Sequence, residues 1–328
     1  MSATNNVPVI CSTDNVDIDL ASPTAGHEIE LTGLNYNGVT GGTLTIGDTF
    51  VDGDKIAEAL TNSTNSPIVV TYTFQVTTPL TTPACPVVPV DEVVTVTVNP
   101  IPDVAASAQS ICDGGTTSVS ITNPNGVSGT TFSWTIGTVT GTVTGQAAGT
   151  GTVISQTLSS AAGGTVEYLV TASANGCSPA APTSVIVTVE ALPVGTAVPS
   201  GSEFVCSGES LNIIPVADVV GTTFVWTGDN GSGGSGNITD APVNGGNSAV
   251  DVTYTVVPTG PGPNTCVGLP FDIVVTVNPD PVMSATNNVP VICSTDNVDI
   301  DLASPTAGHE IELTGLNYNG VTGGTLTI

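Results

Sequence analysis

Seven cysteines are the residues of this chain best suited to covalent chemistry. They come in a regular order, two in each of three successive stretches and one more near the end: Cys11 and Cys85, Cys112 and Cys177, Cys206 and Cys266, and then Cys293. Paired thiols of this regularity are typical of proteins that form disulfides in an oxidising, extracellular compartment. The cysteine pattern therefore predicts structural disulfides.

Acidic side chains form two clusters whose carboxylates could act as ligands for a metal ion. Asp48, Asp52 and Asp54 lie in GDTFVDGDK, and Asp14, Asp17 and Asp19 lie in STDNVDID. Ca²⁺ takes about six to eight oxygen ligands, but neither cluster completes the calcium loop DxDxDG…E. We expect solvated carboxylates on loops and strands, with a Ca²⁺ site at Asp48, Asp52 and Asp54 as the alternative.

The remaining polar motifs give no catalytic constellation. His27, repeated as His309, has no second histidine and no nucleophile with a base beside it. The glycine-rich stretches GSGGSG (231–236) and GTVTGTVTG (137–145) are not followed by a helical pattern, so they are no phosphate-binding loops but hairpin tips or flexible loops. Asn62, Asn230 and Asn237 begin glycosylation sequons in loop-like sequence. We expect no enzyme and no resident cofactor apart from the Ca²⁺ alternative.

The charge balance excludes two classes of partner. The formal net charge is −27, and Lys55 is the one Lys or Arg against 28 acidic residues. Nucleic acids and anionic lipids are bound mainly through Lys and Arg, so neither is expected as a partner. No apolar run approaches the roughly 18 residues of a membrane span. The sequence therefore predicts an extracellular segment that does not insert into a membrane.

Residues 1–46 recur without a mismatch as residues 283–328. The second copy follows PDPV directly, so Met283 is an ordinary internal residue. A fixed period dictates the architecture of repeat proteins. We expect the chain to be one period plus part of the next, cut from a longer tandem array.

Short alternating runs predict strands, and proline-containing linkers predict the boundaries between units. VTVTV (94–98), VIVTV (185–189) and IVVTV (273–277) each close a unit and precede a linker. The predicted units are 1–100, 101–192 and 193–281, followed by 282–328 as a truncated repeat of the first. The first unit is divergent and has longer loops. DKIAEAL (54–60) is the one short helix candidate.

Each unit carries the same aromatic landmarks. Trp134, Trp226 and Leu31 occupy one position, which we assign to the core of the third strand, and Tyr72, Tyr168 and Tyr254 lie in a late strand. About seven short strands with a core Trp and a late Tyr are typical of an immunoglobulin-like sandwich. The sequence thus predicts an all-β protein of tandem immunoglobulin-like sandwiches.

Two cysteine pairings remain open in such a fold. One joins the two cysteines of each unit: Cys11–Cys85, Cys112–Cys177 and Cys206–Cys266. However, the first cysteine precedes strand B at one pole and the second lies in the F–G loop at the other, about 23 Å away for a seven-residue strand. Bridged Cα atoms lie about 4.4–6.8 Å apart. We therefore favour disulfides between units, namely Cys11–Cys177 and Cys112–Cys266, with Cys85, Cys206 and Cys293 bonding to domains beyond this segment.

The motifs ICxG, TTFxW, NGC and VTVNPxP fall in a characteristic order, as in NPIPDVAASAQSICDGGTTSVSI, TTFSWT and TASANGCSPAAPTSVIVTV. In this order they resemble the PKD-like, immunoglobulin-like repeats of giant cell-surface adhesins of Bacteroidetes, including the gliding-motility type. The resemblance covers all units and is clearest in the second and third. It implies a secreted, cell-surface, non-catalytic repeat protein and no particular ligand.

We expect tandem PKD-like sandwiches arranged as a rod, which act as the structural stalk of a long extracellular adhesin or surface filament. The expected partners are neighbouring copies of the same repeat, and the sequence identifies no surface or glycan ligand. One alternative is an array of carbohydrate-binding modules, which would show an exposed aromatic platform. Another is a secreted subunit that polymerises by strand exchange, in which residues 282–328 complete a neighbour's sandwich.

Overall fold

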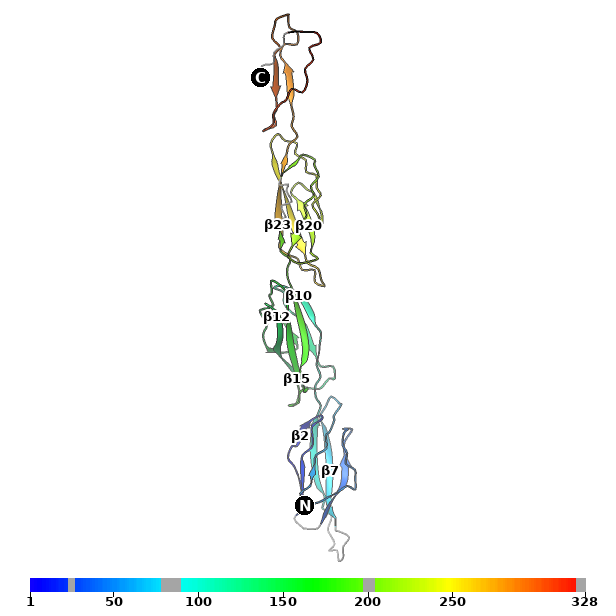
Figure 1. Cartoon of the computed structure of the whole chain (residues 1–328). Helices are drawn as coiled ribbons and strands as arrows, with labels where there is room; N and C mark the ends of the chain where they lie inside the picture. Colours follow the sequence, from blue (N-terminus) through cyan, green and yellow to red (C-terminus); the bar gives the residue numbers. More distant parts are fainter. Residues whose placement is uncertain (23–26, 78–89, 197–203, 323–328) are drawn as a thin grey trace, which may run out of the picture. The chain divides into compact units, whose positions relative to one another are not determined.

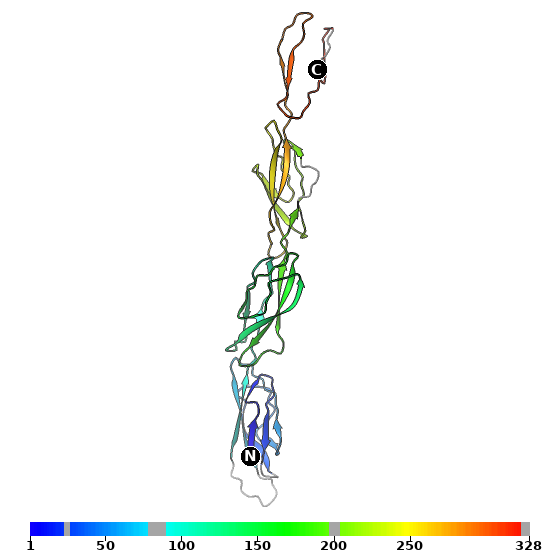
Figure 2. The same cartoon turned by 90° about the vertical axis from the view of Figure 1, so that its left-hand side faces the viewer.

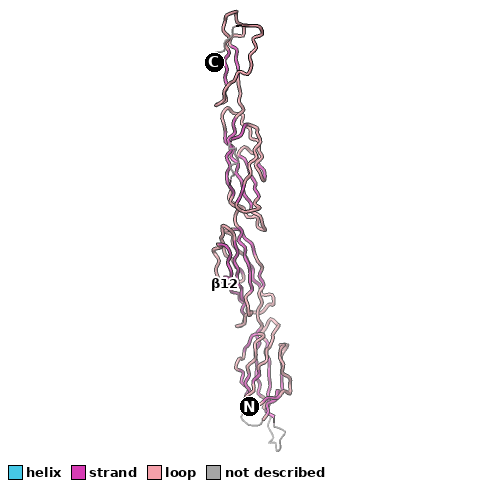
Figure 3. Tube along the Cα trace, in the orientation of Figure 1, coloured by secondary structure: helices cyan, strands magenta, loops and turns pink. Residues whose placement is uncertain are grey.

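The structure is a computed structural model that describes residues 1–22, 27–77, 90–196 and 204–322. It divides into two compact units, Met1–Glu190 and Ala191–Ile328, and each is described by itself. The described residues form strands and turns and no helix (Figure 3). The prediction of an all-β chain of tandem immunoglobulin-like sandwiches is confirmed.

The first domain packs two sheets against each other, with strand orders β1-β3-β6 and β2-β8-β7-β4-β5 (Figure 1). Its strands are β1 (Ser2–Asn5), β2 (Val9–Cys11), β3 (Ile18–Ala21), β4 (Glu28–Asn35), β5 (Thr49–Phe50), β6 (Lys55–Ile56), β7 (Ile68–Thr77) and β8 (Glu92–Asn99). Alternating residues of β7 point inward, so that Val70, Tyr72 and Phe74 are fully buried. The two inner faces form one apolar core.

The first strand of this domain is split between the two sheets. β1 pairs antiparallel with β3, whereas β2 pairs parallel with β8 and places Cys11 opposite Asn99. Pro8 stands between the two halves, where no ladder donor is needed. The same parallel pairing recurs in the next two domains. It brings the first cysteine of each domain beside the end of its closing strand.

The second domain repeats this plan with sheets β14-β11-β9 and β10-β16-β15-β12-β13 (Figure 2, in green). Its strands are β9 (Ala105–Ala106), β10 (Gln109–Cys112), β11 (Val119–Thr122), β12 (Thr131–Gly141), β13 (Gly149–Thr150), β14 (Val153–Ile154), β15 (Gly164–Ser173) and β16 (Thr183–Glu190). A separate cluster of buried residues forms its core.

The second unit holds a third domain and the repeat of the first residues. The third domain has sheets β17-β19 and β18-β23-β22-β20-β21, and the repeat forms one hairpin, β24-β25. The strands are β17 (Gly195–Thr196), β18 (Phe204–Cys206), β19 (Val216–Ala217), β20 (Thr223–Gly228), β21 (Gly233–Ser235), β22 (Val250–Thr259), β23 (Phe271–Asn278), β24 (Ser284–Asn287) and β25 (Ile300–Ala303). The third domain has its own core cluster.

Trp134, Trp226 and Leu31 lie at one register position of the three sandwiches, and all three are buried. The residue opposite on the neighbouring strand is Val170 for Trp134, Val256 for Trp226 and Phe74 for Leu31. The small Leu of the first domain thus faces a large Phe, and each large Trp faces a Val. The two positions thus vary together and conserve the total side-chain volume, and protein cores tolerate substitutions of this kind well.

The segment 54–60 is extended and forms no helix, contrary to the candidate in the sequence. Ile56, Glu58 and Leu60 are buried, and the residues between them are exposed. Apolar residues four apart fit one helix face, but they also fit alternate positions of a strand. The buried Glu58 decides between the two, because it accepts hydrogen bonds from the hydroxyls of Tyr36 and Tyr72 in the core.

The two glycine-rich stretches are partly strand. Residues 137–141 end β12, and Gly233–Ser235 form β21. Gly234 of the second stretch lies opposite Trp226, and Gly149, which follows the first stretch and begins β13, lies opposite Trp134 in the same way. A Cβ at either glycine would come within 2.6 or 2.7 Å of the indole ring. Glycine is therefore required where the Trp ring covers the neighbouring edge strand.

Candidate functional site: the junction between consecutive domains

Cys11, the last residue of β2, begins the junction between the first two domains. Its amide donates a hydrogen bond to Asp14 Oδ2 at 3.1 Å, and the Ser12 amide donates to the carbonyl of Asn99 at 2.8 Å. The chain then turns through Thr13, whose φ is 80°. These bonds hold Cys11 beside the end of β8, directly before the linker to the second domain.

Cys177 closes the tight turn that follows β15 in the second domain. Ala174 and Cys177 exchange two backbone hydrogen bonds, of 3.0 and 2.8 Å, around Asn175 and Gly176. The φ angles of these two central residues are 51° and 82°. Asn-Gly is the dipeptide that such a left-handed turn favours. The NGC motif of the sequence is thus a tight turn that fixes the position of this cysteine.

A disulfide joins Cys11 to Cys177, with the two Cα atoms 5.5 Å apart and a sequence separation of 166. Neither cysteine therefore pairs with the other cysteine of its own domain. Beside the disulfide, Asn99 Nδ2 donates to the carbonyl oxygen of Asn175 at 3.0 Å, and Asn99 is 5% exposed. The two domains of the first unit are thus joined by a covalent bond and a partly buried hydrogen bond in addition to the linker.

The linker itself is bound to the second domain. Pro100 and Pro102 have no backbone N–H to donate. The peptide groups of Ile101 and Asp103 beside them form hydrogen bonds with the side chain of Asn125. Asn125 Nδ2 donates to the Ile101 carbonyl at 2.9 Å, and the Asp103 amide donates to Asn125 Oδ1 at 3.2 Å. A docked linker with two prolines leaves little freedom at this joint.

The second unit builds a similar joint between its third domain and the repeat. The Val282 amide donates to Thr306 Oγ1 at 3.0 Å, and the Ala307 amide donates to the Asn247 carbonyl at 3.3 Å. The Cys293 amide donates to Asp296 Oδ2 at 2.8 Å, as the amide of its counterpart does in the first domain. The local turn after the cysteine is therefore the same in both copies of this sequence.

The other cysteines fall into three groups. Cys112 and Cys266 are each disulfide-bonded. Their predicted pairing with each other stays a prediction. Cys206 and Cys293 are free thiols on the surface, and their predicted bonds to further domains stay predictions as well. Cys85 lies outside the described residues.

The carboxylates considered for Ca²⁺ each accept a hydrogen bond from a backbone amide, within a local turn for Asp48 and Asp54 and from a distant segment for Asp52. Each accepts a backbone amide at 2.8 Å: Asp48 from Thr45, Asp52 from Ser22 and Asp54 from Val51. In the part of the chain that the structure describes, no three His, Cys, Asp or Glu residues are grouped closely enough to hold a metal ion. The donor set is thus that of hydrogen-bonded turns.

Two members of the second acidic cluster, Asp17 and Asp19, pair with the one lysine, whereas Asp14 accepts a hydrogen bond from the Cys11 amide. Lys55 Nζ lies 2.7 Å from Asp17 Oδ1 and 3.2 Å from Asp19 Oδ1. The hydrogen bond from Lys55, followed by one from Asn6, holds the pKa of Asp17 below its usual value. All three charged groups are exposed, and surface ion pairs contribute little to stability.

The histidine and the first sequon have structural roles. His27 Nδ1 lies 3.2 Å from the carbonyl of Thr77. Asn62 is 4% exposed, and its Nδ2 donates to the carbonyls of Ser66 and Val98 at 2.9 and 2.8 Å. The folded domain therefore keeps the nitrogen of Asn62 from a glycosylating enzyme.

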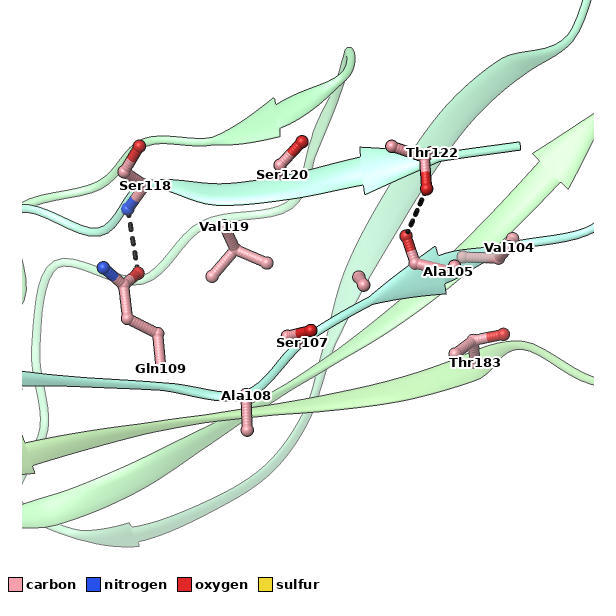
Figure 4. A pocket seen from close by; sticks show the side chains of 11 residues that line it. Val104, Ala105, Ser107, Ala108, Gln109, Ser118, Val119, Ser120, Thr122 and Thr183 are labelled. Atoms are coloured by element: carbon pink, nitrogen blue, oxygen red, sulfur yellow. Dashed lines mark hydrogen bonds between the residues drawn. The ribbon is translucent and has the colours of Figure 1, made fainter. Parts of the chain in front are cut away.

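An open depression on the second domain is lined by small side chains from β9, β11 and the start of β16 (Figure 4). Two hydrogen bonds connect residues that line it, one from the Ser118 amide to Gln109 Oε1 and one from Thr122 Oγ1 to the Ala105 carbonyl. No aromatic or charged side chain lines it. Among the described residues the exposed aromatic rings are those of Phe204 and Tyr318, so no aromatic platform for a sugar is formed there.

Fold and junction together define a class: tandem immunoglobulin-like sandwiches joined by short proline-containing linkers and by a disulfide between consecutive domains. A family model described as PKD-like domain matches residues 109–193 and 203–281. The chain belongs to the PKD-like domain family, whose members are generally non-catalytic structural modules. No curated protein is similar to the chain in sequence. No described residues form a helix long and apolar enough to cross a bilayer.

Several solved structures resemble the chain in fold. Extracellular domains 3–5 of Drosophila OTK are 11% identical, with 85% of this chain and 97% of that chain covered and a TM-score of 0.32. Three immunoglobulin domains of titin are 9% identical, with 85% and 99% covered and a TM-score of 0.38. Immunoglobulin domains 1–5 of Sidekick-1 are 14% identical, with 85% and 60% covered and a TM-score of 0.28. Likeness at this level indicates no function.

Proposed function

We propose that this chain is part of the non-catalytic stalk of a long extracellular adhesin or surface filament, similar to the giant adhesins of Bacteroidetes. The observation that carries the proposal is the Cys11–Cys177 disulfide between consecutive domains. Its partners are neighbouring copies of the same repeat, and an arrangement of the domains as a rod is part of the proposal. The role requires no cofactor.

A disulfide at this place changes how the chain carries force. Cys11 lies near the start of the first domain in sequence, and Cys177 lies near the end of the second. Tension applied to the two ends of this pair passes through the disulfide and bypasses residues 12–176. Those residues cannot extend while the bond is intact, even if a sandwich unfolds. A stalk built in this way keeps its length under load.

Charge and redox chemistry support the extracellular location. Disulfides persist in oxidising compartments. The near absence of Lys and Arg leaves one site for trypsin-like proteases, at Lys55, which is an advantage outside cells. The predicted Cys112–Cys266 bond and the bonds of Cys85, Cys206 and Cys293 to further domains would continue the same device along an array.

The proposal is tested by pulling single chains from their two ends with and without a reductant. The test uses a Cys112→Ser, Cys266→Ser chain, because both cysteines are disulfide-bonded and a bond between them would overlap this loop. In that chain, complete extension should rise by about 560 Å on reduction of Cys11–Cys177, at roughly 3.4 Å per residue. Adding Cys11→Ser to it should give the same extension without reductant. Cys293→Ser, which removes an unpaired thiol, is the matched control and should behave as wild type.

Equal extensions before and after reduction would contradict the force-bearing role of the disulfide. A catalytic turnover or a tight, saturable small-molecule site would contradict the structural role in general.

A further inference from the structure

The three proline-containing linkers differ in the residue before their last proline. That residue is Ile101 in the first linker, Leu192 in the second and Asp280 in the third. Asp280–Pro281 is also the one Asp-Pro bond of the chain. A bond to proline is a tertiary amide, whose nitrogen is protonated more readily than that of an ordinary peptide. A carboxyl group beside such a bond can attack it from within the chain.

The fold places a buried hydroxyl group on the carbonyl of this bond. Asp280 itself is exposed, so water and protons reach its side chain. Thr306 is 3% exposed and lies beside the linker. Its hydroxyl accepts a hydrogen bond from the Val282 amide at 3.0 Å and donates to the Asp280 carbonyl at 3.5 Å. This second bond is long, as catalytic hydrogen bonds often are before the transition state tightens them.

We propose that Asp280–Pro281 is a self-cleavage site that acts in acid, with Asp280 as the nucleophile and Thr306 as the donor to the carbonyl oxygen. The protonated carboxyl of Asp280 attacks the carbonyl carbon of the same residue. The C–N bond to Pro281 breaks, the carboxyl proton passes to the Pro281 nitrogen, and a cyclic anhydride forms. Water then opens the anhydride and leaves Asp280 with two carboxyl groups. The inference goes beyond the stalk role and does not depend on it.

The charged groups around the linker are nearly all acidic. β23 carries Asp272, β25 carries Asp301, and the turn that bonds the end of β23 carries Glu209. The second unit contains no Lys or Arg, and His309 is its one histidine. No lysine or arginine of this unit can therefore pair with Asp280 and keep its carboxyl ionised in acid.

Cleavage at this place separates the chain into two parts. Cys293, the one cysteine after the bond, is a free thiol, so no disulfide connects the fragments of this chain. In the tandem array expected from the sequence, one such bond would lie in the linker before each copy of residues 1–46. Acid would then release whole periods of three domains.

The test is to incubate the full chain at about pH 4.5, folded and in parallel unfolded in urea, and to follow the fragments by mass spectrometry. Tryptophan fluorescence verifies that the first sample stays folded. The expected products are residues 1–280 and 281–328, formed about tenfold faster in the folded chain because only there does Thr306 lie on the carbonyl. Equal rates in the two samples would mean an ordinary acid-labile bond and would overturn the proposal, as would an intact chain.

Two variants separate the roles of nucleophile and donor. Asp280→Asn removes the nucleophile and should slow cleavage about a hundredfold or more. Thr306→Val should slow it about tenfold in the folded chain and leave the rate in urea unchanged, and Thr306→Ser, which restores the hydroxyl, should recover most of the rate. Cleavage of folded Thr306→Val at the wild-type rate would contradict the role of the hydroxyl.

The first linker offers a matched position that has the donor but lacks the carboxyl. Asn125 Nδ2 donates to the Ile101 carbonyl at 2.9 Å, and Pro102 follows. Ile101→Asp should therefore gain a second cut before Pro102, seen after reduction because the Cys11–Cys177 disulfide spans it. A bond that stays intact in this variant while Asp280–Pro281 is cleaved would contradict the proposed pair of nucleophile and donor.

Discussion

Each domain buries one tyrosine, and the residue that accepts its hydroxyl hydrogen bond differs in charge. The acceptors are Glu58 for Tyr72, Gln156 for Tyr168 and Asp240 for Tyr254. Burial raises the pKa of Tyr168 to about 12. Burial, and then the carboxylate partner, raise the pKa of the other two hydroxyls as well. All three hydroxyls therefore remain donors at neutral pH.

Asp240, which accepts the hydrogen bond of Tyr254 in the third domain, is predicted to make a contribution to stability that is lost in acid. Burial alone would raise the pKa of Asp240, but hydrogen bonds from Asn230, Ser232 and Tyr254 outweigh it and hold the pKa below 3.8. A lowered folded-state pKa stabilises the domain above the unfolded value, and this stabilisation is lost as pH falls through the folded value. We expect the unfolding free energy of the third domain, followed by Trp226 fluorescence in a Trp134→Phe chain, to fall below about pH 4.

Asp240→Asn supplies the comparison for this pH dependence. It should lower the stability at pH 7 and remove the part of the acid slope that this residue contributes. At the same place in the second domain the tyrosine bonds Gln156, which does not titrate, so this contact adds no acid slope there. Identical slopes for wild type and Asp240→Asn between pH 5 and 3 would contradict the assignment.

Thr13 occupies a backbone conformation that suits glycine better. Its φ is 80°, and the residues at the same place after the cysteine in the next two domains are Gly114 and Gly208, at 76° and 74°. A left-handed conformation costs a non-glycine residue about 1–2 kcal/mol, and the freer unfolded chain of glycine offsets roughly half of this. Thr13→Gly is therefore expected to raise the unfolding free energy of the first domain by about 0.5 kcal/mol in urea titrations.

The reverse change is the control for this prediction. Gly114→Thr should destabilise the second domain by about 0.5 kcal/mol, because the same two effects act with opposite sign and a Cβ there meets nothing within 4 Å. A clear loss of stability in Thr13→Gly would show that the threonine side chain makes a contribution that its exposed position does not suggest.

At the scale of elements, the contact between Trp226 and β21 makes a sharp prediction. A Cβ at Gly234 would lie 2.7 Å from the indole ring, whereas a Cβ at Gly245 in the same domain would meet nothing within 4 Å. Overpacking of this kind costs about 1–3 kcal/mol. We expect Gly234→Ala to lower the unfolding free energy of the third domain by that amount and Gly245→Ala to change it little. Equal effects would mean that the edge strand moves away freely from the ring.

The sequence predicts strands well where residues alternate and poorly where a buried polar group takes part. The alternating runs of β7, β8 and β16 and the shared position of Trp134, Trp226 and Leu31 follow from residue types alone. The segment 54–60 does not, because nothing local shows that Glu58 turns inward to meet two tyrosines from other strands. Strand β21 in the stretch 231–236 does not follow either, because the reason for Gly234 is the Trp226 ring on the neighbouring strand.

At the scale of the whole molecule, the repeats and the order of the cysteines predict the domain organisation better than any single motif does. The offset between residues 1–46 and 283–328 and the two cysteines per domain are visible in the sequence. The hydrogen bonds of the junction are not, because Asn99, Asn125 and Asn175 resemble ordinary loop asparagines until the domains are side by side. The family match indicates structural modules and leaves the ligand of the whole protein open to experiment.

The central claim is that a disulfide connects consecutive domains, and disulfide mapping tests it most directly. The oxidised chain is alkylated, digested without reduction by an Asp-specific protease, and analysed by mass spectrometry. The structure predicts a linked pair of peptides that contain Cys11 and Cys177. A Cys112–Cys177 pair, or a Cys11–Cys85 pair, would place the disulfides within single domains and contradict the account.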